Sequence, residues 1–274
     1  MTFAMGRLRF LLFSAPVMIA GSACLAMVEA VTWCFDRSGR WQERVSRCWC
    51  RMVLSAAFIR VRTEGLEKIG RHGGYVFVAN HSSYLDTPAL LAQLPGNVRF
   101  FAYRGLFDLP FFGAHLKAAG HLPADSSDVW TSSASLARGT RLLGQSGNSL
   151  ALFPEGSRTP RGLREFREGA AYLAIKAGVP VVPIGIVGLR ELMPVGSLYM
   201  RRGSVQIRVG DPIPTGALTE SDRGALTRRL HAAVARLMNG GASSQGDFPT
   251  ADERADSQSV VQPRGAERHG LDRP

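Results

Sequence analysis

Short apolar runs recur through the middle of the chain, and each is followed by polar or glycine-containing residues. The runs are rich in β-branched and aromatic residues, and they cover residues 75–79, 98–103, 149–153, 181–187 and 205–209. Strands that are apolar on both sides are typical of sheets whose two faces are both covered. These five segments are therefore predicted to be buried strands.

Stretches with helical patterning separate these runs. They cover about residues 87–94, 108–118, 127–145, 167–178 and 220–238. Strands that alternate with helices form mainly parallel sheets, because parallel neighbours need a long crossover connection. The pattern predicts an α/β fold, with a mainly parallel sheet flanked by helices.

The first sixty residues follow a different pattern. Residues 10–28 form an uncharged stretch of nineteen residues, close to the roughly 20 needed to span a bilayer. After it, Arg and Trp side chains alternate with apolar ones over residues 37–62, which is typical of a membrane surface. We expect membrane-anchoring helices over residues 1–64. A secretory signal, a spanning helix and a hairpin embedded in one leaflet all remain open.

The remaining chain divides into a body and a tail. Residues 65–239 hold all the predicted strands and the helices between them, and so should form the functional domain. Residues 240–274 are polar, rich in Gly and Pro, and almost free of large apolar side chains. Such a segment cannot bury enough apolar surface to fold, so we expect a disordered tail.

The charge of the chain favours an anionic partner. There are 33 Lys and Arg against 22 Asp and Glu, a formal net charge of +11. The sequence lacks a helix-turn-helix pattern, zinc-finger spacing and ribonucleoprotein aromatic motifs, so an anionic membrane surface is favoured and nucleic acid is not. The four cysteines lack the spacing of a zinc site, and we expect neither a metal nor a disulfide there.

The first polar cluster is "NHSSYLD", residues 80–86, directly after a predicted strand. His81 is a candidate general base, since an imidazole with a pKa near ~6.5 is largely neutral at cytosolic pH. Asp86 would bind the other ring nitrogen and fix the tautomer. Five positions on one helix would place the two side chains about 140° apart. His81 must therefore precede the helix or begin it. Turn and capping residues have the same composition, so the cluster alone is ambiguous.

A second strand ends in "PEGSRT", residues 154–159. Gly156 permits close backbone approach, and the guanidinium of Arg158 suits a phosphate group. Taken alone, the segment would be a surface turn with a local Glu–Arg pair. Two polar strand ends in one sheet favour a ligand site, because ligands in such folds bind at the carboxyl ends of the strands.

The two clusters together resemble the glycerolipid acyltransferase family. "NHSSYLD" matches its His-x4-Asp motif, and "FPEGSRT" is similar to its phosphate-binding signature, with Ser157 in place of Thr. Between them, residues 103–120 resemble the second block of the family, with Arg104 where Lys is common and with Pro110, Gly113 and Gly120 in place. "FREGA" and "VPVVPI", residues 166–170 and 179–184, continue the series. The resemblance spans about residues 65–210, and the bacterial 1-acyl-sn-glycerol-3-phosphate acyltransferases are the most similar subfamily.

The resemblance implies acyl transfer from acyl-CoA or acyl carrier protein to a lysophospholipid acceptor at the cytoplasmic face of the bacterial inner membrane. It implies no cofactor beyond that co-substrate. The residues it implies are catalytic His81 and Asp86, and substrate-binding Arg104, Glu155, Gly156, Ser157 and Arg158. We expect Glu155 to order the phosphate loop or bind the glycerol of the acceptor.

One departure leaves the acceptor open. After Gly120 the family usually has a strand that ends in Asp-Arg, whereas this chain reads "HLPADSSD". Lyso-ornithine lipid is therefore an alternative acceptor, and an inactive membrane-binding scaffold is a further alternative. A serine hydrolase is disfavoured, because no Gly-x-Ser-x-Gly elbow stands at a strand end.

Overall fold

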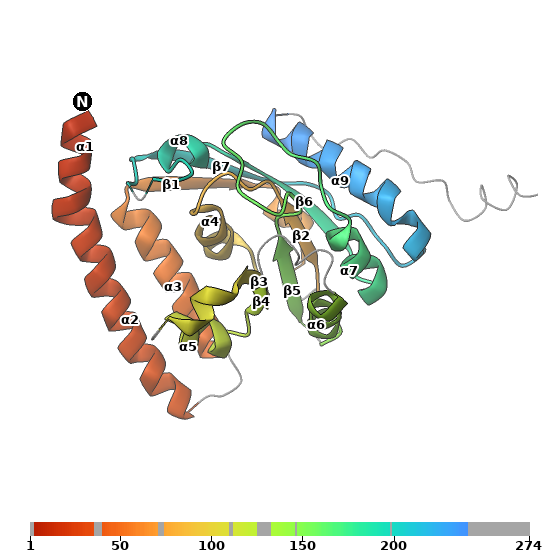
Figure 1. The fold of residues 1–274 in the computed structure, drawn as a ribbon, viewed down its shortest axis with the longest axis horizontal. Coiled ribbons are helices and arrows are strands. Elements are labelled where there is room, and N and C mark those ends of the chain that lie inside the picture. The colour runs from red at the N-terminus through yellow and green to blue at the C-terminus, as the bar shows by residue number, and fades with distance from the viewer. Residues whose placement is uncertain are drawn as a thin grey trace, which may run out of the picture. The chain divides into compact units, whose positions relative to one another are not determined.

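The computed structural model describes residues 3–35, 40–70, 74–109, 112–124, 133–145, 147–197 and 199–240, and the fold is given for these ranges. A seven-stranded sheet forms the centre of this part of the chain, in the order β1-β7-β6-β2-β5-β3-β4 (Figure 1). The strands are β1 Ile59–Glu64, β2 Val76–Ala79, β3 Asn97–Tyr103, β4 Leu122–Ala124, β5 Asn148–Leu152, β6 Val181–Val187 and β7 Gly203–Val209.

Neighbouring strands are parallel except β6 and β7, which are antiparallel. The predicted α/β class and mainly parallel sheet are thus confirmed, and all five predicted strands are present. Two strands were not predicted. The helical prediction for 59–64 was wrong, because "IRVRTE" alternates apolar and polar side chains along edge strand β1. Strand β4 has three residues and contains Pro123, so it has no apolar run of its own.

Helices cover both faces of the sheet. They are α1 Phe3–Arg9, α2 Ala15–Phe35, α3 Arg40–Ala56, α4 Asp86–Gln93, α5 Phe112–Ala118, α6 Ser133–Leu143, α7 Gly169–Ala177, α8 Leu189–Leu192 and α9 Arg223–Met238. Helix α5 begins four residues later than predicted, after the 3-10 turn η3, Arg104–Asp108. Of the helix predicted at 127–145, the first six residues lie outside the described ranges, as do Pro110 and the predicted tail from residue 241.

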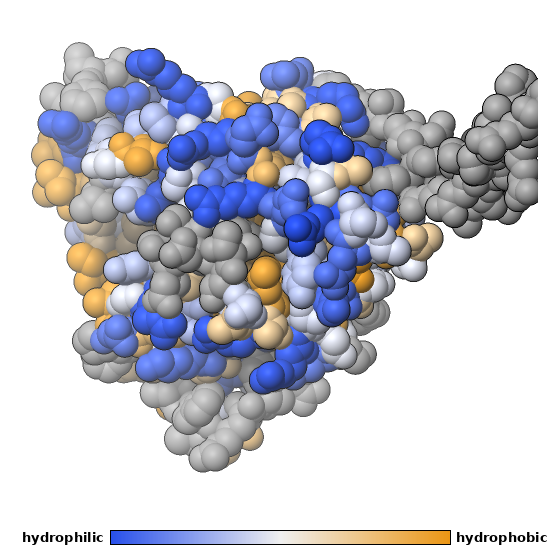
Figure 2. Space-filling view, turned by 45° about the vertical axis from the view of Figure 1, so that its right-hand side comes forward, coloured by the Kyte–Doolittle hydropathy of each residue, from blue (hydrophilic) through white to orange (hydrophobic). Residues whose placement is uncertain are grey.

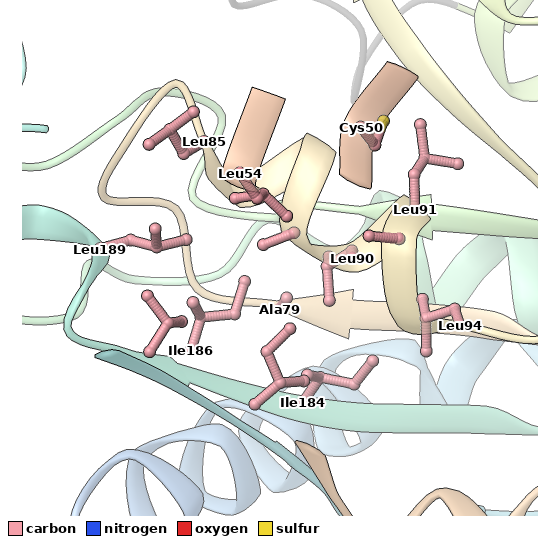
Figure 3. Close-up of a cluster of buried hydrophobic side chains, with 14 of the residues drawn as sticks. Cys50, Leu54, Ala79, Leu85, Leu90, Leu91, Leu94, Ile184, Ile186 and Leu189 are labelled. Carbon is pink, nitrogen blue, oxygen red and sulfur yellow. The ribbon is translucent and has the colours of Figure 1, made fainter. Parts of the chain in front are cut away.

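The hydrophobic core positions helix α4, and with it Asp86. Leu90 on α4 and Leu94, which directly follows the helix, are fully buried, and the core cluster joins them to Ile184 of β6 and Leu54 of α3 (Figure 3). Burying a leucine side chain contributes about 2 kcal/mol. Arg47 of α3 adds polar anchors, since its guanidinium donates to the main-chain carbonyls of residues 91, 94 and 96 around the end of α4.

The N-terminal segment is one long helical run, in which the π-helical turn η1, Phe10–Ser14, joins α1 to α2. Its part Gly6–Val28 is long and apolar enough to cross a membrane. One side packs on the domain: Trp49 Nε1 of α3 donates to Ser22 Oγ at 2.9 Å, and the ring of Phe10 meets that of Tyr199 edge-on.

The other side of this helix is exposed. The large apolar side chains that it presents are Leu8, Leu11, Leu12, Phe13, Val17, Ile19, Met27, Val28, Val31 and Phe35. Figure 2 shows hydrophobic residues gathered at the left edge of the molecule, where the helix lies in Figure 1, while the face beside it is mostly hydrophilic. An apolar surface of this extent indicates membrane association.

Candidate active site

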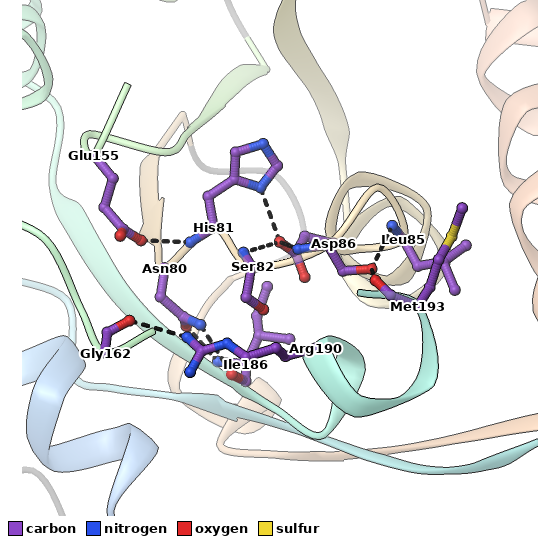
Figure 4. Close-up of polar contacts among 11 residues, drawn as sticks. Asn80, His81, Ser82, Leu85, Asp86, Glu155, Gly162, Ile186, Arg190 and Met193 are labelled. Carbon is purple, nitrogen blue, oxygen red and sulfur yellow. Dashed lines mark hydrogen bonds and ion pairs between the residues drawn. The ribbon is translucent and has the colours of Figure 1, made fainter. Parts of the chain in front are cut away.

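His81 and Asp86 lie on the connection between β2 and α4. Strand β2 ends at Ala79, and Asp86 is the first residue of α4. The arrangement expected from the spacing is the one found, with His81 ahead of the helix and Asp86 in its first turn. His81 Nδ1 lies 2.8 Å from Asp86 Oδ2 (Figure 4). The two side chains are a hydrogen-bonded pair.

The carboxylate of Asp86 is completely buried and accepts three hydrogen bonds at one oxygen. Besides His81, the backbone N–H groups of Ser82 and Ser83 reach Oδ2, at 2.6 and 2.8 Å. A buried carboxylate needs such donors to remain charged. Its bond to Nδ1 keeps the imidazole proton on that nitrogen and leaves Nε2 as the proton acceptor.

The preceding residue, Asn80, anchors this connection to the sheet. Its side-chain amide donates to the carbonyl of Ile186 at 2.9 Å and accepts from the N–H of Ile186 at 2.7 Å. Both atoms belong to the end of β6, next to β2. The backbone that carries His81 is therefore fixed on one side by the sheet and on the other by α4.

The loop after β5 completes the support of His81. The ring of Phe153 stacks on the imidazole, with centroids 4.1 Å apart and planes inclined by 12°. The backbone N–H of Thr159 donates to the carbonyl of His81 at 3.0 Å. The two clusters found in the sequence thus meet at the carboxyl ends of β2 and β5, because these strands are parallel neighbours.

Glu155 lies behind this loop and not in the cavity wall. It is 4% exposed; Oε1 accepts from the N–H of His81 at 2.6 Å and Oε2 from that of Arg164 at 3.0 Å. Burial raises the pKa of this carboxyl, and the two backbone donors oppose the rise. Of its two expected roles, the geometry favours ordering the loop over binding the acceptor.

Gly156, Ser157 and Arg158 line the cavity. Gly156 has φ 76°, a left-handed conformation that favours glycine. The guanidinium of Arg158 lies 3.7 Å from the ring centroid of Tyr84, and Ser157 Oγ accepts from Arg164 Nη1 at 2.7 Å. A cation over an aromatic face is held in place while its N–H groups stay available.

Arg104 is the one predicted site residue that the structure leaves apart. Arg104 is itself exposed and begins turn η3; it does not line the cavity, although Tyr103 and Leu106 beside it do. Its assignment depended on the resemblance alone.

A cavity of about 870 Å³ opens beside His81. Its wall is mostly apolar and comes from helices α2, α3, α4 and α5 and strands β3, β4 and β5. Side chains of the exposed N-terminal helix, including Leu25 and Ala26, form part of it. A volume of this size holds a lipid-sized ligand. The part of the N-terminal helix in this wall was not predicted, because only the tertiary fold brings α2 to the cavity.

The sequence suggested no interaction partner for two histidines that line the cavity, His115 and His121. His115 Nε2 lies 2.9 Å from Ser46 Oγ, and His121 Nδ1 accepts from the backbone N–H of Phe100 at 3.2 Å. Burial, together with the charge of Arg99 and the neighbouring His115, lowers the pKa of His121 to about 3. His121 is therefore neutral in the folded protein at neutral pH.

This shift predicts a loss of stability in acid. Below about pH 6.5 the unfolded chain protonates His121 and the folded chain does not, so the free energy of unfolding falls as pH drops. One such group contributes about 1.4 kcal/mol per pH unit. His121→Phe removes the titration. The free energy of unfolding of both proteins is measured by denaturant titration from pH 7 to 4. The wild-type value minus the variant value should fall by about that slope as the pH drops. If the two free energies change in parallel with pH, the pKa shift is contradicted.

Comparison with known proteins gives consistent results. Residues 60–187 match the Acyltransferase family. The chain is 33% identical over 183 residues to chloroplastic 1-acyl-sn-glycerol-3-phosphate acyltransferase BAT2 of Brassica napus, an alignment that covers 65% of this chain and 52% of that protein. It is 31% identical over 173 residues to human 1-acyl-sn-glycerol-3-phosphate acyltransferase alpha, covering 63% and 61%. The chain thus spans about half to three fifths of the length of these two relatives.

A solved structure has the same fold. The crystal structure of the 1-acyl-sn-glycerophosphate acyltransferase PlsC from Thermotoga maritima superposes with a TM-score of 0.74 at 20% identity, covering 87% of this chain and all of that one. The match of residues 60–187 to the Acyltransferase family confirms the resemblance read from the motifs, and the solved structure shows the fold.

Proposed function

Residues 60–187 of this chain are a domain of the acyltransferase family, and on that premise we propose that it acylates a lysophospholipid. The acceptor is 1-acyl-sn-glycerol-3-phosphate, the donor is acyl-CoA or acyl carrier protein, and the product is phosphatidic acid. One observation carries the proposal: His81 lines a lipid-sized apolar cavity, while its Nδ1 is occupied by Asp86.

The reaction follows from that geometry. The free hydroxyl of the lysolipid attacks the thioester carbonyl, and its proton passes to His81 Nε2 as the new C–O bond forms. Asp86 stabilises the imidazolium that results. The tetrahedral intermediate then expels the thiolate, which takes the proton from the imidazolium of His81. The imidazole is thereby neutral again. A thioester is already activated, so the proposed reaction needs no cofactor, and no serine becomes acylated.

Arg158 is proposed to bind the phosphate of the acceptor. Arg158 lies in the cavity wall, on the loop after β5. It contacts Tyr84, which lies on the same connection as His81. The apolar remainder of the cavity would hold acyl chain, and α2 forms part of its wall. Because the outer face of α2 is apolar and exposed, lipid would enter from the membrane. We place the protein at the cytoplasmic face of the bacterial inner membrane, next to the supply of acyl thioesters.

The test is a comparison of acceptors. Purified protein in anionic vesicles is given labelled acyl-CoA, or labelled acyl carrier protein, with lysophosphatidate, lysophosphatidylglycerol or lyso-ornithine lipid, and products are identified by mass spectrometry. The proposal expects labelled phosphatidate in excess of the other products. Preferred acylation of lyso-ornithine lipid would change the acceptor, and vesicle binding without any product would mark a scaffold.

Arg158→Ala should weaken acceptor binding and leave the chemical step largely intact. We expect KM for lysophosphatidate to rise about 10- to 100-fold, the loss of one charge-assisted contact, with kcat changed much less. Steady-state kinetics at several lysophosphatidate concentrations measure this. Arg141→Ala on the exposed side of α6 is the matched control. An unchanged KM in Arg158→Ala would show that the phosphate binds elsewhere.

A further inference from the structure

His121 presents a hydrogen-bond donor to the cavity. Its Nδ1 accepts from the backbone of β3 at Phe100, so its proton is on Nε2. The residue is 7% exposed and lines the cavity, and with Nδ1 facing the strand, Nε2 is the nitrogen that reaches the open space. Within the described residues, Nε2 has no hydrogen-bond partner. The low pKa of His121 keeps this single N–H donor in place at neutral pH.

Further polar groups lie beside it. The ring centroids of His115 and His121 are 6.5 Å apart, and Ser46 Oγ of α3 lies 2.9 Å from His115 Nε2. All three residues line the cavity, whose wall here is otherwise formed by apolar side chains such as Val45 and Leu116. A plain hydrocarbon chain at this position would leave the N–H of His121 unpaired, which is unfavourable in an apolar environment.

A series of rings joins this cluster to the proposed catalytic base. Phe153 stacks on His81 with centroids 4.1 Å apart, Phe100 stacks on Phe153 at 6.2 Å, and His121 follows Phe100 at 6.1 Å. Each of the four lines the cavity. A chain whose carbonyl group lies at His81 can therefore extend along these rings until it reaches His121.

We propose that the cavity selects an acyl chain that carries a hydroxyl group, and that His121 Nε2–H donates a hydrogen bond to its oxygen. The hydroxyl can in turn donate to Ser46 Oγ, which the same part of the wall presents. The inference rests on the proposed function, since it names a chemical class of its substrate. The hydroxyl could be on the transferred acyl chain or on the acyl chain already present in the acceptor. The experiment distinguishes these two cases.

The experiment measures a ratio of specificity constants. Acyl-CoA donors of one chain length, plain or hydroxylated at carbon 2, carbon 3, mid-chain or the terminus, are each paired with plain lysophosphatidate. A second arm pairs plain acyl-CoA with lysophosphatidate whose own chain is hydroxylated at those positions. In one arm, one position should raise kcat/KM about 3- to 10-fold over the plain chain, the effect of one hydrogen bond. The arm in which this occurs identifies the chain that is recognised.

The variants assign the preference to His121. In His121→Phe the hydroxyl preference should fall to one or below, because the donor is replaced by a hydrocarbon edge. The ratio is independent of the fraction of protein that folds. His121→Asn is a second test if the first variant is unstable: its carbonyl can still accept from Phe100 N–H, but the shorter side chain places no donor at the Nε2 position, so the preference should again fall to one or below. His231→Phe, the same substitution on α9 outside the cavity, should keep the preference.

The outcomes are distinguishable from those for the proposed function. If plain donors are transferred to lysophosphatidate but no hydroxylated chain is preferred in either arm, the inference fails and the proposed function stands. The same holds if the preference persists in His121→Phe, since a different group then makes the contact. If lysophosphatidate is not acylated by any donor, the proposed function fails first.

Discussion

His81→Ala should reduce acyl transfer to lysophosphatidate about 10²- to 10⁴-fold, because the attacking hydroxyl loses its general base. The fall should appear in kcat. KM for lysophosphatidate should change little, since the proposed phosphate contact, Arg158, is untouched. Initial rates of phosphatidate formation from labelled acyl-CoA in anionic vesicles measure both constants.

The control for this variant is His231→Ala. His231 lies on α9 and contacts Phe166 edge-on, and it does not line the cavity. It should transfer acyl groups at the wild-type rate. Full activity in folded His81→Ala, checked by circular dichroism and vesicle binding, would show that another group takes the proton.

Asp86→Asn should reduce kcat about 10²- to 10³-fold, through loss of charge and not through a change of tautomer. The backbone N–H groups of Ser82 and Ser83 both point at the Oδ2 position, so the asparagine oxygen must occupy it. There it still accepts from His81 Nδ1–H. The neutral amide cannot stabilise the imidazolium as the carboxylate does. The buried amide NH₂ takes the position of Oδ1, which lacks a hydrogen-bond partner among the described residues, so we also expect about 1–3 kcal/mol of destabilisation.

Two measurements separate these effects. The rate is measured well below the unfolding midpoint of the variant, and the free energy of unfolding is measured by urea titration. Asp211→Asn removes a surface carboxylate, which pairs with Lys68 at 3.0 Å, and should leave kcat unchanged. A wild-type kcat in Asp86→Asn would mean that the charge of Asp86 has no part in the reaction.

The sheet was largely predictable because most of its strands are buried on both faces. Every residue of β2 is buried, and β6 is buried along all but its last residue, so each forms a continuous apolar run. Edge strand β1 lacks that signal. Its Arg60 and Arg62 resemble the interfacial arginines of a membrane helix, and only pairing with β7, about 140 residues later, identifies a strand. The antiparallel pairing of β7 with β6 likewise depends on long-range contacts.

The site was predictable where its geometry is local. His81 and Asp86 are five residues apart, and the strand before them and the helix after them fix their relation. Glu155 bonds to a backbone N–H 74 residues earlier in the chain, so sequence spacing gave no sign of its role behind the loop. His121 was not predicted for the same reason, since its partner is the backbone of β3. Helix α2 was recognised as apolar, but its place in the cavity wall depends on packing against α3.

The most direct test of the central claim, that the lysolipid hydroxyl itself attacks the thioester without an acyl-enzyme, omits the acceptor. Wild-type protein is mixed with excess acyl-CoA alone, and released CoA and the intact protein mass are followed; lysophosphatidate is then added. We predict no acyl-protein and no burst of CoA before the addition, followed by CoA and phosphatidate in equal amounts. Release of one CoA per protein before any acceptor is present, with an acyl group on the chain, would contradict the claim.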